Sequence, residues 1–314
     1  MYIQNPVAIQ VEVAEVIDCY LIAMLIVGNK PIKLTSALDE KKDIDVELCN
    51  SFYIRKIKSL PNVDIQFSFS LLKGKPPKKG GNREIYYQDQ TKLFVDREGF
   101  LQLLYRYKNK RDFLWQLNID PDFSDFKYLL SPYAAQTIDL YYLVFNRFLL
   151  QHTFINHHGL IIHAAGGSIH GKGMVFPAVS GTGKSTLSHL LLPFPENQLY
   201  SEERIIMRKM DDGWHLWGTP WKGTGSIARN ESAPLSALVF LSQAPQTKIS
   251  ALAPAAALRR LLETVSIPWY SQEWIDKGLV VCESLLRDIP AFELAFRPDH
   301  TAVQAVEQLA ASLS

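Results

Sequence analysis

The stretch AVSGTGKSTL, which begins at Ala178, constrains the fold of this chain more than any other segment. From Ala178 to Ser185 it follows the pattern G-x-x-x-x-G-K-[ST], except that alanine stands in place of the first glycine. The segment GMVFPAV before it predicts a strand, and STLSHLLLP after it predicts a helix that ends at Pro193. A strand, a glycine-rich turn and a helix in this order indicate a phosphate-binding loop in an α/β domain. The alternative is a plain turn before an amphipathic helix, with no ligand.

The residue types of this loop suit a bound chain of phosphates. Two glycines let the backbone wrap so that successive N–H groups point inward, and the helix N-terminus adds partial positive charge. We expect Lys184 to reach the β- and γ-phosphates and the Ser185 hydroxyl to bind Mg²⁺. The sequence therefore predicts ATP and Mg²⁺ as ligands of a loop made of Ser180, Gly181, Thr182, Gly183, Lys184, Ser185 and Thr186.

Composition and charge exclude several classes of partner. The chain has 314 residues, with 33 Lys and Arg against 32 Asp and Glu, and this balance argues against a nucleic-acid or membrane partner. The apolar run over residues 17–27 contains Asp18 and is too short to span a bilayer, so we expect a buried strand there and no targeting segment. The widely spaced Cys19, Cys49 and Cys282 form neither a disulfide framework nor a metal-ligand spacing, which predicts a cytoplasmic protein.

The chain is long enough for two domains. Residues 1–130 contain short, nearly alternating apolar segments and predict a β-rich N-terminal domain that contacts the substrate or a sister subunit in a homo-oligomer. Residues 131–152 predict a linker helix, and residues 153–314 the α/β domain. Two prolines, three glycines and five cations in residues 72–84 predict a loop, which either faces water as a hairpin tip or grips an anion.

Within residues 153–314 strands and helices alternate. LIIHAAGGSIH and GMVFPAV predict one hairpin, RIIMRK and WHLWG a second one around Asp212-Gly213, and SALVFLSQ and FELAF two further strands. Helices are predicted from Pro254 and in the closing segment HTAVQAVEQLAASL. Many phosphate-loop proteins place a magnesium-binding acid after a second buried strand. SALVFLSQ cannot supply one, but GLVVCES offers Glu283, which is equally well explained as a residue on the rim of a strand.

Further motifs lie at characteristic distances from the loop. His163 is on the predicted strand before it, Ser180 to Ser185 give Ser-Gly-x-Gly-Lys-Ser, LYSEERIIM carries the pair Glu202-Glu203, and GTPWKGTG and APLSALVFL follow. In these motifs residues 155–310 resemble the HPr kinase/phosphorylase family, and more closely its relatives that act as peptide kinases in ribosomal-peptide gene clusters. The resemblance implies a mixed sheet with flanking helices, like that of phosphoenolpyruvate carboxykinase, and an ATP-dependent serine kinase of a peptide or protein.

The resemblance also implies roles for the matching residues. Glu202, the first acid of the pair, is expected to take the proton of the attacking hydroxyl, Glu203 to bind Mg²⁺ or a lysine, and His163 to orient Glu202 or the hydroxyl near the γ-phosphate. The family usually has Asp-Asp here. The longer glutamate moves the carboxylate by about one ångström, an error that can cost about 100-fold in rate unless a neighbouring loop compensates for it.

Two cations are candidate phosphate or substrate contacts, because positive charge must face the phosphate in transfer. They are Lys222, in the glycine-rich segment PWKGTG, and Arg229. A plain turn explains Lys222 equally well. Similarly, Glu202-Glu203-Arg204 also fits an exposed strand start, and a histidine such as His163 is often a satisfied core residue.

Three other functions are consistent with the sequence. A nucleotide-binding regulator or scaffold with a degenerate acid pair is one, and its test is that Glu202→Gln leaves every ATP-dependent activity unchanged. A phosphorylase or phosphatase that acts on phosphoserine is the second, since the family relation allows the reverse reaction. The third is a structural protein in which the glycine loop merely turns the chain.

Overall fold

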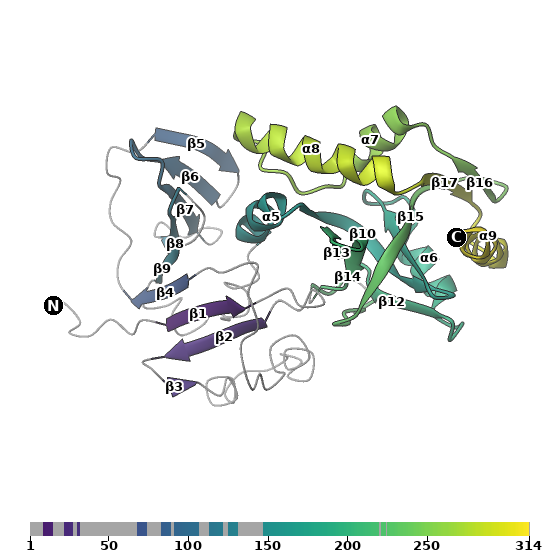
Figure 1. The fold of residues 1–314 in the computed structure, drawn as a ribbon, viewed down its shortest axis with the longest axis horizontal. Helices are drawn as coiled ribbons and strands as arrows, with labels where there is room; N and C mark the ends of the chain where they lie inside the picture. The colour runs from purple at the N-terminus through teal and green to yellow at the C-terminus, as the bar shows by residue number, and fades with distance from the viewer. Residues whose placement is uncertain are drawn as a thin grey trace. The chain divides into compact units, whose positions relative to one another are not determined.

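A computed structural model describes residues 9–14, 22–27, 30–31, 68–73, 83–88, 91–106, 113–121, 125–130, 147–219, 221–223 and 225–313. The chain divides into two compact units, Met1–Leu149 and Leu150–Ser314 (Figure 1). Of the predicted linker helix, residues 131–146 lie outside the described residues, as do Cys19, Cys49 and the predicted loop between residues 74 and 82. None of the helices in the described ranges is long and apolar enough to cross a membrane.

The first unit contains two β-sheets, which confirms the prediction of a β-rich N-terminal region. One is a three-stranded antiparallel sheet in the order β1-β2-β3. The other has the order β4-β9-β8-β7-β6-β5, in which only the β4–β9 pair is parallel. The strands are β1 (Ile9–Ala14), β2 (Ile22–Val27), β3 (Lys30–Pro31), β4 (Ser68–Lys73), β5 (Arg83–Gln88), β6 (Thr91–Val95), β7 (Leu101–Arg106), β8 (Phe113–Ile119) and β9 (Asp125–Leu130).

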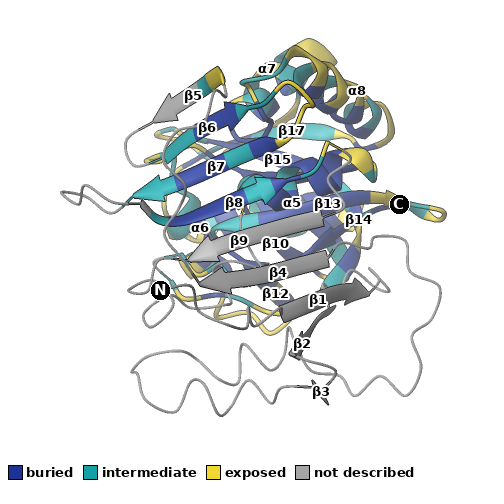
Figure 2. Ribbon diagram, turned by 90° about the vertical axis from the view of Figure 1, so that its left-hand side faces the viewer, coloured by how far each residue is buried: buried dark blue, intermediate teal, exposed yellow. Residues whose placement is uncertain are grey.

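Alternating apolar residues explain the core of the six-stranded sheet. Leu101 and Leu103 of β7 pair with Ile119 and Leu117 of β8, and all four side chains are buried. Successive side chains of a strand point to opposite faces, so residues two apart reach the same core. Figure 2 shows buried residues along β6, β7 and β8.

The second unit is an eight-stranded mixed sheet with flanking helices, as predicted. Its order is β11-β10-β13-β14-β15-β17-β16, with β12 paired to β10 and a further pairing of β11 with β15. β15 runs parallel to β11 and to β17, whereas the other pairings are antiparallel. The strands are β10 (Gly159–Ile169), β11 (Lys172–Pro177), β12 (Asn197–Ser201), β13 (Arg204–Met210), β14 (Gly213–Trp217), β15 (Ser232–Gln243), β16 (Lys248–Ala251) and β17 (Ala291–Phe296).

Five helices are described in addition to these strands: α5 (Arg147–Asn156), α6 (Lys184–Leu191), α7 (Pro254–Leu262), α8 (Gln272–Asp288) and α9 (His300–Ser312). Helix α6 packs beside α9, and their apolar faces share one buried cluster with β11, β15 and β17 (Figure 1). Helix α7 packs against α8, which also contacts β10. The two predicted hairpins, the helix from Pro254, the strand FELAF and the closing helix are all confirmed.

The expectation of a strand at GLVVCES is wrong, because this segment lies within α8. The buried residues of α8 recur at helical spacing over the whole helix. They are Trp274, Gly278, Val281, Cys282 and Leu285. A short apolar run such as Gly-Leu-Val-Val does not distinguish a strand from a buried helix segment. Glu283 is therefore not an acid that follows a buried strand.

Candidate active site

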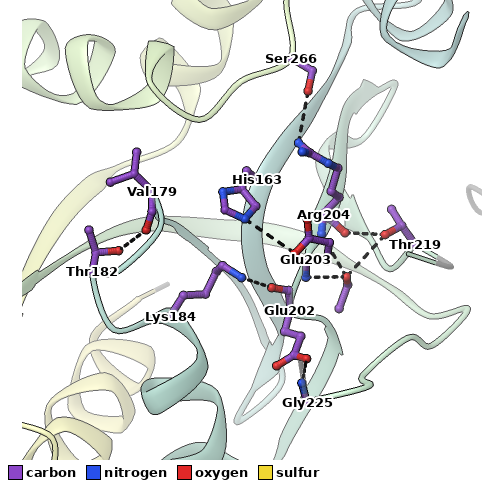
Figure 3. A network of polar contacts seen from close by, with 11 residues as sticks. His163, Val179, Thr182, Lys184, Glu202, Glu203, Arg204, Thr219, Gly225 and Ser266 are labelled. Carbon is purple, nitrogen blue, oxygen red and sulfur yellow. Dashed lines mark hydrogen bonds and ion pairs between the residues drawn. The ribbon is translucent and has the colours of Figure 1, made fainter. Parts of the chain in front are cut away.

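Three segments that lie far apart in the sequence meet at the middle of β10 (Figure 3). His163 pairs with Arg204 at the start of β13, and Gly166 pairs with Ser201 at the end of β12. The start of the phosphate loop joins the same place, because the Ala178 N–H donates to the His163 carbonyl over 3.2 Å. The histidine, the loop and the acid pair come together because His163 lies on β10 and the strands that carry the other two segments pair with β10.

A bulge in the β10–β12 pairing turns the chain just before the acid pair. The register shifts between Gly166 and Gly167, which leaves Tyr200 of β12 as the extra residue. A Cβ at Gly167 would lie 2.0 Å from the Gln198 carbonyl oxygen, so the close approach of the two strands requires glycine. Beyond the bulge, the two acids form the connection between β12 and β13.

Two hydroxyl groups that sequence reasoning missed hold this connection. Ser201 Oγ accepts the backbone N–H groups of Glu203 and Arg204, each over 3.3 Å. Thr219 Oγ1 donates to the Arg204 carbonyl over 2.7 Å. A serine placed just before a turn commonly makes such local bonds, so the Ser-Glu-Glu sequence contained a signal for the first of these contacts.

The phosphate loop enters α6 through two glycines in the left-handed conformation. The φ angle is +85° at Gly181 and +103° at Gly183, which caps the helix. Thr182 Oγ1 donates to the Val179 carbonyl over 2.9 Å. A Cβ at Gly183 would also lie 2.7 Å from the buried Phe296 ring, so both the dihedral angle and the packing require glycine there. A sharp turn into a helix N-terminus is the geometry that directs N–H groups at an anion.

Gln243 is a loop contact that sequence reasoning also missed. Its Nε2 donates to the Gly181 carbonyl over 2.8 Å. Gln243 ends β15, which runs parallel to β11, so the carboxyl ends of both strands lie at the same edge of the sheet. SALVFLSQ was predicted as a strand, but its parallel pairing with β11 is a tertiary feature, so no local pattern in the sequence indicated Gln243.

A cavity of about 420 Å³ opens beside the start of α6. The phosphate loop and α6 form one wall, and the ends of β15 and β17 form the others. A volume in this range is typical of small-molecule sites, which span about 300–1,000 Å³. The lining residues are Gly183, Thr186, Gln243, Ala244, Pro245, Phe296 and Pro298.

Lys184, the first residue of α6, reaches across to the acid pair. Its Nζ donates to the backbone carbonyl of Glu202. Burial lowers the pKa of Lys184 below its ordinary value, while the carboxylates of Glu203 and then Glu202 oppose this shift. The ammonium group is therefore placed between the phosphate loop and the acids (Figure 3).

The carboxylate of Glu203 faces His163. Glu203 Oε2 lies 3.8 Å from His163 Nε2, and the two side chains are 34% and 26% exposed. Burial lowers the pKa of His163 from its ordinary value of 6.5; nearby Lys184 adds to this effect and Glu203 opposes it. The imidazole is consequently neutral at pH 7, a state in which one ring nitrogen donates and the other accepts.

The carboxylate of Glu202 points the other way, into the segment that we call the glycine loop (residues 221–223 and 225–226). Glu202 is 1% exposed, and its Oε1 accepts the N–H of Gly225. Cβ atoms at Gly223 and Gly225 would approach the Glu202 side chain to 3.0 and 2.5 Å. The interpretation of the pair as an exposed strand start is therefore wrong for Glu202.

The remaining predicted residues of the phosphate loop lie where the motif places them. Ser180 and Thr186 are exposed, on the loop and on the first turn of α6 respectively, and Ser185 beside Lys184 is half-buried. The described residues contain no group of three or more His, Cys, Asp or Glu that could hold a metal ion. Ser185 nevertheless fits a Mg²⁺ ion that arrives with phosphates, because such an ion keeps most of its waters and takes few protein ligands. The other predicted ligand, Glu203, faces His163.

The two predicted cations lie on the surface. Lys222 is exposed on the glycine loop. Arg229 is exposed beyond that loop, where its backbone N–H donates to the Tyr200 carbonyl over 2.7 Å. The structure thus brings His163, Lys184 and Glu203 together and turns the Glu202 side chain aside.

The fold and this site define an α/β protein in which a glycine-rich loop and a pair of acids meet beside one strand, β10. The sequence model of the family described as SynChlorMet cassette protein ScmC matches residues 131–294, more than half of the chain. The chain therefore belongs to the ScmC family. A search of curated proteins finds no match.

Proposed function

We propose that this protein is a Mg-ATP-dependent kinase that transfers the γ-phosphate to a hydroxyl group, that of a serine in a peptide or protein. One observation carries the proposal: the Lys184 ammonium is placed between a glycine-rich loop at a helix N-terminus and the acid pair. Phosphoryl transfer needs little covalent work from a protein, so positioning and charge neutralisation dominate.

The surroundings of the loop support a nucleotide as the ligand. The turn at Gly181 and Gly183 suits phosphates, and the cavity beside Thr186 is large enough for a small molecule. The Ser185 hydroxyl would hold Mg²⁺, which supplies positive charge against the phosphate oxygens when bound. The exposed Lys222 lies on a neighbouring glycine-rich segment, where a cation can contact the phosphate or the acceptor.

The motif resemblance points in the same direction. His163, the phosphate loop and the acid pair match the HPr kinase/phosphorylase family in type and order, although the pair is Glu-Glu where that family has Asp-Asp. Membership of the ScmC family is compatible with this wider relationship. We therefore place the chain, as part of the proposal, beside the peptide kinases related to HPr kinase.

A nucleotide-binding regulator is a second candidate, and one observation favours it. Glu202, the acid that the resemblance assigns as base, is buried against Gly225. If neither acid served as a base, the protein would bind ATP without transferring phosphate. Transfer of label from γ-labelled ATP to a pool of serine peptides separates the two functions.

The first experiment is calorimetry of Mg-ATP binding to the parent protein, Lys184→Ala and Lys172→Ala. Lys172 begins β11 at its hairpin end and is a matched control for loss of a lysine on the same strand–loop–helix unit. We expect saturable binding by the parent and Lys172→Ala, and none by Lys184→Ala. Equal binding by all three proteins would show that the loop does not bind phosphate, and absence of binding by the parent would refute the proposed function.

A further inference from the structure

The two acids of the pair are adjacent in the sequence but have opposite environments. The Glu202 side chain enters the glycine loop and is 1% exposed, whereas the Glu203 side chain is 34% exposed and faces His163 (Figure 3). A group that takes a proton from an incoming hydroxyl must be within hydrogen-bond reach of it. By this criterion, the positions of the two carboxylates are enough to distinguish which acid can act as the base.

Glu202 is enclosed by the protein itself. Its Oε1 accepts the Gly225 N–H, and Oε2 is buried without a hydrogen-bond partner among the described residues. An alanine Cβ at position 225 would lie 2.5 Å from Oε2, so the loop backbone lies directly against the carboxylate. No acceptor hydroxyl can reach either oxygen unless the glycine loop moves away.

Glu202 also joins two loops of the site. Its backbone carbonyl accepts the Lys184 ammonium, and its side chain accepts the Gly225 N–H. The loop makes one further turn on itself, in which the Ser226 N–H donates to the Gly223 carbonyl over 3.2 Å. Glu202 thus links the Lys184 ammonium to the glycine loop, which carries Lys222.

Glu203 has the accessibility that Glu202 lacks. Its Oε2 is 3.8 Å from His163 Nε2, and its backbone N–H is held by Ser201 Oγ over 3.3 Å. Its charge acts on both His163 and Lys184. His163 is suited to orient it, since the imidazole lies beside this acid.

We propose that Glu203 takes the acceptor proton and does not bind Mg²⁺, and that Glu202 is a positioning residue that anchors the glycine loop to the phosphate loop. The inference rests on the proposed kinase function. In the transfer step the acceptor oxygen forms a bond to the γ-phosphorus of ATP, and the bond from that phosphorus to the β–γ bridging oxygen breaks. The electron pair of that bond leaves with ADP, and the acceptor proton goes to a Glu203 carboxylate oxygen.

Matched isosteric variants test the division of roles. Glu203→Gln removes the base, so we expect transfer of label from γ-labelled ATP to fall by at least about 100-fold while Mg-ATP affinity is retained. Glu202→Gln keeps an oxygen that can accept the Gly225 N–H, so we expect it to retain most of the transfer activity. Glu202→Ala removes the anchor, so transfer should fall, and Glu202→Gln serves as its conservative rescue.

Trypsin cleavage after Lys222 reports the anchor independently of activity. We expect cleavage about tenfold faster in Glu202→Ala than in the parent, because a buried hydrogen bond to the loop is lost, and parent-like cleavage in Glu203→Gln. Circular dichroism of each variant shows whether the fold is retained. If Glu202→Ala does not fold, Glu202→Gln and Glu203→Gln still test the roles by their transfer rates.

The outcomes separate failure of this inference from failure of the proposed function. Loss of transfer in Glu202→Gln with retention in Glu203→Gln would reverse the roles, and equal losses would overturn the division. A parent that binds Mg-ATP but transfers nothing overturns the kinase function, and the base role of Glu203 with it. Unchanged cleavage in a folded Glu202→Ala protein would overturn the anchoring role whatever the activity.

Discussion

In the phosphate loop, Gly181 has a φ of +85°, and apart from its two chain neighbours no residue that the structure describes has an atom within 4 Å of the place where a Cβ would lie. In the glycine loop, a Cβ at Gly225 would lie 2.5 Å from the Glu202 carboxylate. Glycine in the first loop permits a backbone turn and leaves space in front of it. Glycine in the second loop lets a side chain of the same protein occupy the space. Glycine is therefore required in the two loops for different physical reasons, and substitutions can distinguish these reasons.

The largest effect is expected for Gly183→Ala. The left-handed conformation costs an alanine about 1–2 kcal/mol, and overlap with the Phe296 ring adds about 1–3 kcal/mol. Urea unfolding should show a loss of about 3 kcal/mol, and calorimetry should show no Mg-ATP binding, because the helix N-terminus shifts. Parent-like stability would mean that Phe296 yields easily, and the loop would then be less tightly packed than we conclude.

The next largest effect is expected for Gly225→Ala. The added methyl group displaces the Glu202 carboxylate, so we expect faster tryptic cleavage after Lys222 and a loss of stability of about 1–2 kcal/mol. In a Glu202→Ala background the same substitution should cost far less, because the colliding atoms are gone. Additive losses in the double mutant would show that the loop and the acid do not contact each other as described.

A smaller effect on stability is expected for Gly181→Ala. Gly181 and Gly171 both have positive φ angles, +85° and +78°, and at both positions a Cβ would meet nothing within 4 Å among the described residues beyond the chain neighbours. Alanine at either position should therefore cost a similar amount, about 1 kcal/mol. Only Gly181→Ala should weaken Mg-ATP binding in calorimetry, since Gly171 lies in the β10–β11 hairpin. Equal binding by both variants would argue against a ligand role for the loop.

The smallest expected effect is a change of stability with pH that depends on His163. The pKa of His163 in the folded protein is lower than its ordinary value of 6.5, so the unfolded chain binds a proton first as the pH falls. The resulting stability is fully present above about pH 6.5 and is lost as the pH decreases towards the folded-state pKa. The free energy of unfolding, measured in urea, should decrease more between pH 7.5 and pH 5.5 for the parent than for His163→Gln. An identical drop in both proteins would contradict a depressed pKa.

Local patterns predicted most of the second unit. The hairpins, the strand and helix on either side of the phosphate loop, and the closing helix follow from apolar periodicity and turn residues, which act over a few positions. Glu283 was misassigned because its short apolar window fits a strand and a buried helix equally well. The helical period becomes visible only over the longer span from Trp274 to Leu285.

The identity of the site residues was more predictable than their orientation. Type and spacing indicated His163, Lys184 and the acid pair, and the register of β10 brings them together. Gln243 and Thr219 join the site only through strand pairing and tertiary contact, which no local pattern reports. The opposite directions of Glu202 and Glu203 arise in the connection between β12 and β13, which follows a bulge in the β10–β12 pairing, and no local pattern reports that pairing.

The missing Cβ at Gly225 has a consequence for how chains of this family can diverge. The space beside Glu202 is shared between the acid and residue 225, so a longer acid and a smaller loop residue belong together. A chain with aspartate at position 202 would leave a gap that an alanine or serine at 225 can fill. We therefore expect the two positions to change as a pair among relatives, whereas position 203 should stay acidic whatever stands at 225.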